Sequence, residues 1–209
     1  MTHVAARLTR DRLALLPAAM HADPAACHAA LAEGGAAFLE FVLAQALGAL
    51  WHHRLHAAGR LESLPSATVE ALRQARITAA VGYLAQRAAL DELDRLFDAV
   101  GVHWVAIKGG HVRECVYPDP ALRLACDIDI LIAPADRRPA AQVLIDAGYR
   151  VHAEPANISH EATFSRTAVD IDLHWHMLRP GRTRVDLTAE LLARRQRIKG
   201  QWGLSDLRL

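Results

Sequence analysis

The sequence predicts an α/β (α+β) protein in which a mixed β-sheet, with helices mainly on one face, is preceded by an N-terminal helical region. Residues 1–100 are rich in alanine and leucine at helical spacing. From Val102 onward, short apolar strands first alternate with helices and then follow one another. We therefore expect two regions, a helical one at 1–100 and a sheet-containing one at 101–209.

Chain length and charge limit the function classes. The 209 residues allow one substantial domain, or one domain with a helical companion, and a 52% share of hydrophobic residues predicts a real core. The 24 basic and 23 acidic residues leave a formal net charge of +1. This balance argues against general duplex nucleic-acid binding, which needs a basic surface, but it allows a small anionic ligand.

Cysteine usage and hydropathy indicate a cytoplasmic protein without a membrane partner. The three cysteines form no CxxC pair, which is typical of reduced thiols. Charged residues are spread through the first twenty positions, where a secretory signal would be apolar. The longest apolar run, at 36–51, contains Glu40 and is too short to span a bilayer.

The helical region has recognisable helix ends. The Asp-Pro pair at 23–24 is typical of an N-cap followed by a first-turn proline. Ser66 is expected to cap a long helix that Gly101 ends in the left-handed conformation. The apolar stripes at 77–88 and 93–100 are slightly out of phase, so a bend or break between them is expected.

The second region is expected to alternate between strands and helices. Gly109 and Gly110 separate the first strand from the first helix, whose residues Val112, Cys115 and Val116 share one face. Gly148 is expected to stop the second helix. The predicted strands are 102–108, 127–133, 149–154, 161–167 and 169–175, and the predicted helices are 111–117 and 136–148.

Two of these strands carry carboxylates at alternating positions. Because successive side chains of a strand point to opposite faces, Asp127 and Asp129 lie on one face of their strand. Asp170, Asp172 and His174 likewise lie together on one face of theirs. If the two strands are neighbours, three or four carboxylates converge, and their repulsion leaves a proton on one of them unless a cation intervenes. Oxygen ligands of this kind suit Mg²⁺.

The glycine pair indicates an anion site next to these carboxylates. A strand that ends in Gly109 and Gly110 before a helix exposes the first N–H groups of that helix and lets a phosphate approach the backbone. Lys108, Arg113 and Arg123 lie in the same segment and are candidates for phosphate contacts. An ordinary tight turn with solvated basic side chains remains the alternative.

Four stretches together resemble the nucleotidyltransferase superfamily of the DNA polymerase beta type. They read "AIKGGHV", "YPDPALRLACDIDILI", "LIDAGYRV" and "VDIDLHWHM" and cover roughly residues 102–178. Within the superfamily, the chain is similar to the uncharacterised nucleotidyltransferases, some of which accompany peptide-modifying biosynthetic clusters. The resemblance implies the nucleotidyltransferase fold, and also a longer helical C-terminal region that the chain as given does not contain.

The resemblance assigns metal ligands and catalytic residues. Asp127 and Asp129 match the metal-binding pair and Asp172 matches the third acid, while Asp170 and His174 are auxiliary candidates. Two Mg²⁺ ions are implied.

The implied reaction moves a nucleoside monophosphate from a nucleoside triphosphate such as ATP. The acceptor is a hydroxyl or similar group on a small molecule, a peptide or a protein, and pyrophosphate is released. Lys108, Gly109, Gly110 and Arg123 are the implied nucleotide-binding residues.

Two other functions stay open on the sequence alone. One is a catalytically silent module of the same fold that binds a nucleotide or a partner. The other is a metal-dependent hydrolase that uses Asp172, His174 and His176.

Overall fold

The computed structural model describes residues 23–152, 160–182 and 184–209. By its internal contacts, the chain forms two compact units. Of the described residues, the first unit contains those up to Val81 together with Ala121–Leu124, and the second contains those of Gly82–Pro120 and Ala125–Leu209. Helix α4 (Ser66–Ala99) has residues in both units, and the change from helices to strands follows it. The expected domain boundary near residue 100 remains a prediction.

The first unit is helical. It contains α2 (Pro24–Ala44), α3 (Gly48–Ala57), the short 3₁₀ turn η1 (Leu61–Ser63) and the first part of α4. The Asp23 carboxylate accepts a hydrogen bond from Ala25 N at 2.9 Å, and Pro24 occupies the first turn, which confirms the predicted cap. The core of this unit consists mainly of Cys27, Leu31, Phe38, Val42, Trp51, Leu55, Leu61, Leu64 and Leu72.

Helix α2 is also long and apolar enough to cross a membrane by length and composition. It is interrupted at Gly35, whose φ of 57° lies in the left-handed region. Four of its side chains are buried in the core of the first unit.

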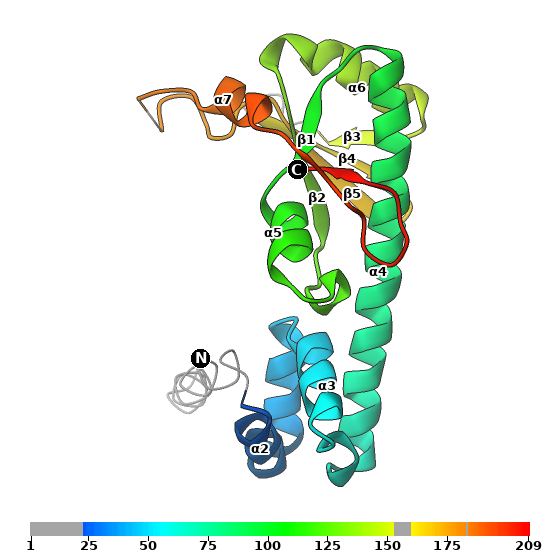
Figure 1. Cartoon of the computed structure of the whole chain (residues 1–209), viewed down its shortest axis with the longest axis vertical. Coiled ribbons are helices and arrows are strands. Elements are labelled where there is room, and N and C mark those ends of the chain that lie inside the picture. The colour runs from blue at the N-terminus through cyan, green and yellow to red at the C-terminus, as the bar shows by residue number, and fades with distance from the viewer. Residues whose placement is uncertain (1–22, 153–159, 183) are drawn as a thin grey trace. The chain divides into compact units, whose positions relative to one another are not determined.

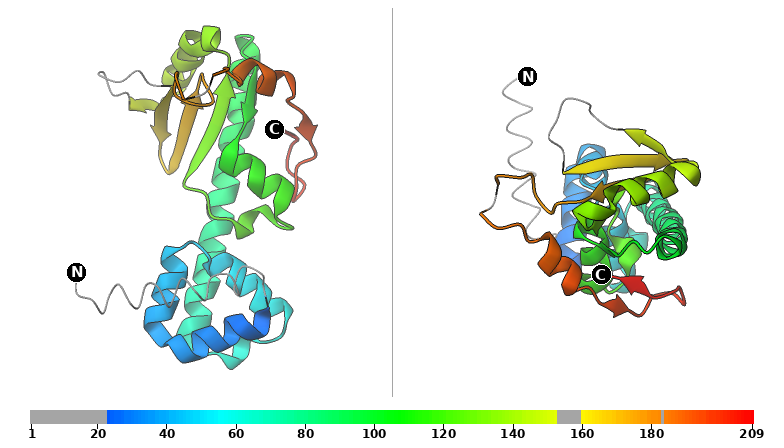
Figure 2. Two further views of the ribbon diagram at one scale, coloured as in Figure 1. Left: turned by 90° about the vertical axis from the view of Figure 1, so that its left-hand side faces the viewer. Right: turned by 90° about the horizontal axis from the view of Figure 1, so that it is seen from above.

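The second unit contains a five-stranded mixed sheet with the strand order β1-β2-β5-β4-β3. Figures 1 and 2 show these strands side by side. Strands β2 and β5 are parallel, and the other neighbours are antiparallel. The strands are β1 (Trp104–Ala106), β2 (Asp127–Ile132), β3 (Arg150–His152), β4 (Glu161–Arg166) and β5 (Val169–His174). The predicted mixed sheet is confirmed.

One face of the sheet is apolar and covered by helices. The second part of α4 and helix α6 (Arg137–Asp146) pack against it, with Leu93 and Leu144 fully buried beside Ile130 and Ile171. Burial of such a side chain contributes about 1.5–3 kcal/mol. Gly101 and Gly148 end these helices with positive φ, as predicted. The expectation of helices mainly on one face is therefore confirmed.

The opposite face is only partly covered. Helix α7 (Thr188–Ala193) contributes Leu192 to a small apolar cluster with Val105 and Leu131 at one end of this face. A two-stranded ribbon, β6 (Arg197–Ile198) with β7 (Leu207–Arg208), completes the second unit. The polar side chains of β2, β4 and β5 occupy the rest of the face.

Two predicted helix faces were wrong. Helix α4 is a single helix, and its Ile77, Val81 and Leu84 are exposed. In α5 (Lys108–Val116), Val116 is 71% exposed and the charged Glu114 is buried instead. These apolar side chains are exposed because Tyr83 and Arg87 of α4 form the buried contact with Glu114 of α5. In the stripe at 93–100, Leu93 and Phe97 are buried.

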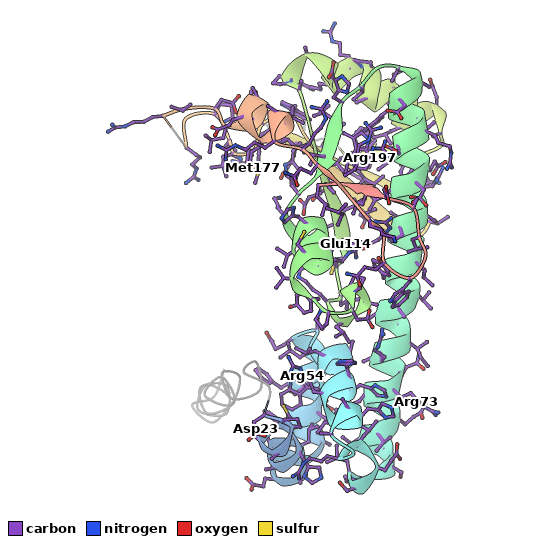
Figure 3. The ribbon with its side chains drawn as sticks, viewed as in Figure 1. Asp23, Arg54, Arg73, Glu114, Met177 and Arg197 are labelled. Carbon is purple, nitrogen blue, oxygen red and sulfur yellow. The ribbon has the colours of Figure 1, made fainter. Side chains whose placement is uncertain are left out.

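A buried polar network joins α5 to the second part of α4. The Tyr83 hydroxyl donates a hydrogen bond to Glu114 Oε1 at 3.0 Å, and Arg87 Nη1 lies 3.6 Å from the same oxygen. Figure 3 marks the position of Glu114. Arg113 donates to the Gln86 side chain, and the Gln86 amide donates to the Ala125 carbonyl at 3.1 Å. The network therefore fixes both α5 and the residues that lead into β2.

We predict that Glu114→Gln lowers the free energy of unfolding of the second unit by about 3 kcal/mol, because it leaves the buried Arg87 without a counter-charge. Urea denaturation followed by circular dichroism measures the change. The matched control is Glu190→Gln, which removes an exposed ion pair with Arg194 and should cost at most about 0.5 kcal/mol. Equal losses in the two variants would contradict the proposed importance of the network.

Candidate active site

The register of β2 and β5 brings the aspartates together. The two strands run parallel, with Asp127 beside Asp170 and Asp129 beside Asp172. Residues paired across neighbouring strands share a face, so all four side chains lie on the face opposite Ile128 and Ile130. The sequence predicted that these carboxylates converge if the two strands are neighbours. The parallel pairing of β2 with β5 meets this condition.

Asp129 is the most deeply buried of the four carboxylates, with 5% of the residue exposed. Its Oδ1 accepts a hydrogen bond from Lys108 Nζ at 2.7 Å and lies 2.9 Å from His174 Nε2. Burial by itself would raise the pKa of Asp129, but the hydrogen bonds from His174 and Lys108 outweigh it and lower the pKa. Asp129 is thus held as a carboxylate.

Asp127 has the opposite electrostatic environment. Burial raises its pKa, and the negative charges of Asp129 and Asp172 raise it further. Asp172 Oδ1 accepts a hydrogen bond from Thr163 Oγ1 at 2.6 Å, which fixes the carboxylate in place. The site therefore holds more negative charge than its protein partners neutralise.

This donor set fits a divalent cation. Single ligand atoms of Asp129, Asp172 and His174 all lie within 4.8 Å of one another. Carboxylate oxygens are the ligands that Mg²⁺ prefers, and a dication would relieve the repulsion that raises the pKa of Asp127. The structure groups Asp129 and Asp172 with His174, whereas Asp127 lies on the same face beside Asp170, and its part in holding the ion remains a prediction.

The N-terminus of α5 lies against the same carboxylates. The backbone N–H of Ile107 donates to the Asp129 carbonyl at 3.0 Å, so the turn after β1 is tied to β2. Helix α5 begins at Lys108, so Gly109 and Gly110 form its first turn instead of preceding it as expected. The N-cap residue, Ile107, provides no side-chain cap. The first N–H groups of the helix are therefore not satisfied by a capping side chain and can bind an anion.

A comparison with known protein families agrees with this geometry. A family model described as "Uncharacterised nucleotidyltransferase" matches residues 34–205. The chain belongs to this family. The recognition made from the sequence is thereby confirmed, and the mixed sheet with its helices is consistent with a nucleotidyltransferase fold. No curated protein and no solved structure gave a match.

Some of the predicted residues of the nucleotidyltransferase are not part of this cluster. Arg123 is half-buried and belongs to the first unit, so its contact with a nucleotide remains a prediction. Arg113 is buried and donates to Gln86, which excludes the phosphate contact considered for it in this conformation. Asp170 shares the face of the site but is exposed. The hydrolase hypothesis required His176 to act together with Asp172 and His174. Instead, His176 Nδ1 lies 2.8 Å from Asp186 Oδ2.

Sequence reasoning missed the contribution of β4 to the site. Glu161 lies opposite His174 in the register of β4 and β5, and Thr163 lies opposite Asp172. The same alternation rule that was applied to β2 and β5 would have placed Glu161 and Thr163 on one face. What it could not show was that β4 pairs with β5.

A cavity of about 500 Å³ lies next to Lys108. Its walls are mostly apolar, with Val105, Ile107 and Met177 among them, and Arg194 adds a positive charge. This composition suits a ligand with an apolar part and an anionic or polar group.

We predict that Asp127→Asn stabilises the protein at neutral pH in the absence of divalent cations. Because the pKa of Asp127 is raised above 3.8, the folded state keeps this proton to a higher pH than the unfolded chain does. The wild type therefore loses stability as pH rises through the raised pKa, whereas the variant does not. Melting temperatures measured across the acid-to-neutral range in a chelating buffer should diverge in this way.

The exposed Asp170→Asn serves as the control for this measurement, since it makes the same chemical change on β5. Its melting temperature should follow that of the wild type across the pH range. Adding Mg²⁺ should then raise the melting temperature of the wild type more than that of Asp127→Asn. A variant less stable than the wild type at neutral pH would show that Asp127 is not under electrostatic repulsion.

Proposed function

We propose that the protein is a Mg²⁺-dependent nucleotidyltransferase that moves a nucleoside monophosphate from a nucleoside triphosphate, such as ATP, to a hydroxyl or similar acceptor. One observation carries the proposal. The parallel register of β2 and β5 gathers Asp127, Asp129 and Asp172 beside the uncapped N-terminus of α5. A cation site and an anion site next to each other suit a metal-bound triphosphate.

The aspartates divide the chemistry between them. Asp127 and Asp129 would hold the cation that orients the triphosphate. Asp172, whose Oδ1 accepts a hydrogen bond from Thr163, would accept the proton of the acceptor hydroxyl. The acceptor oxygen forms a bond to the α-phosphorus while the bond from that phosphorus to the β-phosphate oxygen breaks and pyrophosphate leaves. Bound Mg²⁺ neutralises the charge that develops on the phosphate oxygens.

The first turn of α5 would bind the phosphates. Gly109 carries no Cβ, and the N–H groups of this turn are not capped by a side chain. Lys108 pairs with Asp129 here, and a dication at Asp129 would release its ammonium group for a phosphate oxygen.

The cavity beside Lys108 supports an acceptor with an apolar part. A small molecule, a peptide and a protein side chain can each have an apolar part, so the proposal includes all three acceptor classes. The near-neutral charge of the chain supports a partner other than general nucleic acid, and we place the activity in the cytoplasm.

We predict that Asp129→Asn and Asp172→Asn each lower the rate of nucleotide transfer by about a thousandfold, because each removes a ligand or a base that acts in the transition state. Pyrophosphate release and the mass gained by an acceptor in cell extract are the readouts. The control is Asp170→Asn on the same strand, which should keep its rate within a few-fold of wild type. Unchanged transfer in Asp129→Asn would refute the proposed mechanism.

A catalytically silent binding module of the same fold is the second candidate, because it would use the same cation and anion sites. Calorimetry with ATP and Mg²⁺ distinguishes the two functions. Tight binding without pyrophosphate release in the presence of cell extract would support the silent module. Binding together with release supports the transferase.

A further inference from the structure

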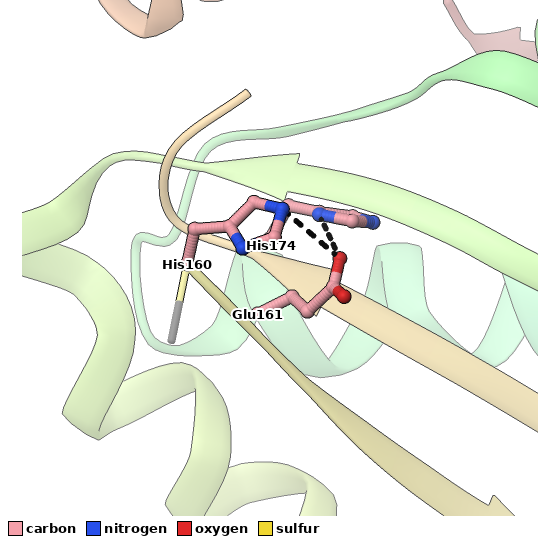
Figure 4. A group of neighbouring side chains, drawn as sticks. All are labelled: His160, Glu161 and His174. Atoms are coloured by element: carbon pink, nitrogen blue, oxygen red, sulfur yellow. Dashed lines mark ion pairs between the residues drawn. The ribbon is translucent and has the colours of Figure 1, made fainter. Parts of the chain in front are cut away.

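A second group of metal-ligating side chains lies where β4 begins and β5 ends. It consists of His160, Glu161 and His174 (Figure 4). The group is built on paired backbone, because Glu161 lies directly opposite His174 and the Trp175 N–H donates to the His160 carbonyl at 2.9 Å. Its geometry is therefore fixed by the sheet and not by a loose loop.

The donor atoms have the separations that a small metal ion requires. Glu161 Oε2 lies 2.9 Å from His174 Nδ1 and 3.4 Å from His160 Nε2. Two ligands of a tetrahedral zinc ion, each bonded at about 2.05 Å, stand about 3.3 Å apart. The two Glu161 separations lie on either side of this value, and the imidazole ligand atoms of His160 and His174 lie within 4.8 Å of each other, so side-chain adjustments would complete the site.

His174 supplies a second observation that points to a ligand. Its side chain is fully buried, and its Nδ1 makes no hydrogen bond within the described part of the chain despite the nearby Glu161 oxygen. Its Nε2 lies in hydrogen-bond range of Asp129 Oδ1 at 2.9 Å. The Lys108 ammonium lies 3.2 Å from the same Nε2. A fully buried Nδ1 without a hydrogen bond, 2.9 Å from a carboxylate oxygen, is a geometry that a metal ion bound to both atoms would complete.

We infer that His160, Glu161 and His174 form a binding site for a divalent transition-metal ion of the zinc type, separate from the carboxylate site for Mg²⁺. Two imidazoles and one carboxylate are a ligand set typical of zinc, whereas Mg²⁺ prefers oxygen ligands alone. Glu161 is 36% exposed at its side chain, so water can reach the remaining coordination position.

Metal at this site would position Asp129. A histidine that ligates metal through one nitrogen commonly donates its other N–H to a carboxylate, which fixes the ring and its tautomer. Here that carboxylate is Asp129, which also accepts from Lys108. His174 is thus a positioning residue between the two cation sites. This consequence rests on the proposed function, whereas the metal site itself does not.

A competing arrangement uses the other edge of the same imidazole. Asp129, Asp172 and His174 also have ligand atoms within 4.8 Å of one another, and there His174 would bind through Nε2. The two arrangements make different demands on the remaining residues. The transition-metal site needs His160 and Glu161, and the alternative needs Asp172.

Zinc binding to the metal-stripped, untagged full chain, measured by calorimetry without nucleotide or Mg²⁺, tests the inference. His160→Ala and Glu161→Gln should each weaken binding by at least about tenfold, since even residues that only support a ligand commonly cost that much. Asp172→Asn should bind zinc nearly as the wild type does. Because nucleotide is absent, the result does not depend on the transferase activity.

The double variant His52→Ala, His56→Ala controls for zinc binding elsewhere, because these two rings stack 6.0 Å apart on α3. It should keep the tight site. Co²⁺ absorption gives a second readout: the visible bands of a low-coordinate, nitrogen-ligated ion should appear in the wild type and disappear in His160→Ala. Zinc affinity that is unaffected by His160→Ala, or lost equally in Asp172→Asn, would overturn the inference. So would loss of the tight site in the His52 and His56 variant.

Discussion

The site depends on one constraint, the parallel pairing of β2 with β5 that sets Asp129 beside Asp172. Carboxylates on neighbouring strands repel one another, and backbone hydrogen bonds hold these in place despite that repulsion. On the opposite face of the same strands, Ile128 and Ile171 are buried against the helices. The strands therefore cannot rotate to separate the carboxylates. The sheet therefore holds several negative charges close together on the face that the helices leave partly uncovered, and a positive charge there lowers their repulsion.

The positive charge is supplied by elements whose own placement relies on polar burial. Lys108 reaches Asp129 because α5 is fixed at its base by the contact of Ile107 with β2 and along its length by Glu114, which meets Tyr83 and Arg87 on α4. A charged interface of this kind is weaker evidence for stability than apolar packing would be. It does fix the register of α5, and the register decides where the first turn lies.

Sequence periodicity predicted what depends on local geometry. Strand alternation placed Asp127 with Asp129, and Gly148 marked the end of a helix, because both follow from neighbouring residues alone. The face predicted for α5 and for the 77–88 stripe of α4 was wrong because the partners are distant in sequence: Glu114 accepts a hydrogen bond from Tyr83, 31 residues away. The part played by Glu161 was missed for the same reason, since strand pairing is not encoded in either strand by itself.

Lys108 links the electrostatics of the site to its backbone. Its φ of 47° lies in the left-handed region, which costs a residue with a side chain about 1 kcal/mol or more. The ammonium–carboxylate contact with Asp129 at 2.7 Å offsets this cost while no dication is bound. On the proposed function, a dication bound at Asp129 would release the Lys108 ammonium, which could then contact a phosphate at the first turn of α5. Neutralisation of the carboxylates and assembly of the phosphate site would then be one event, because the same side chain takes part in both.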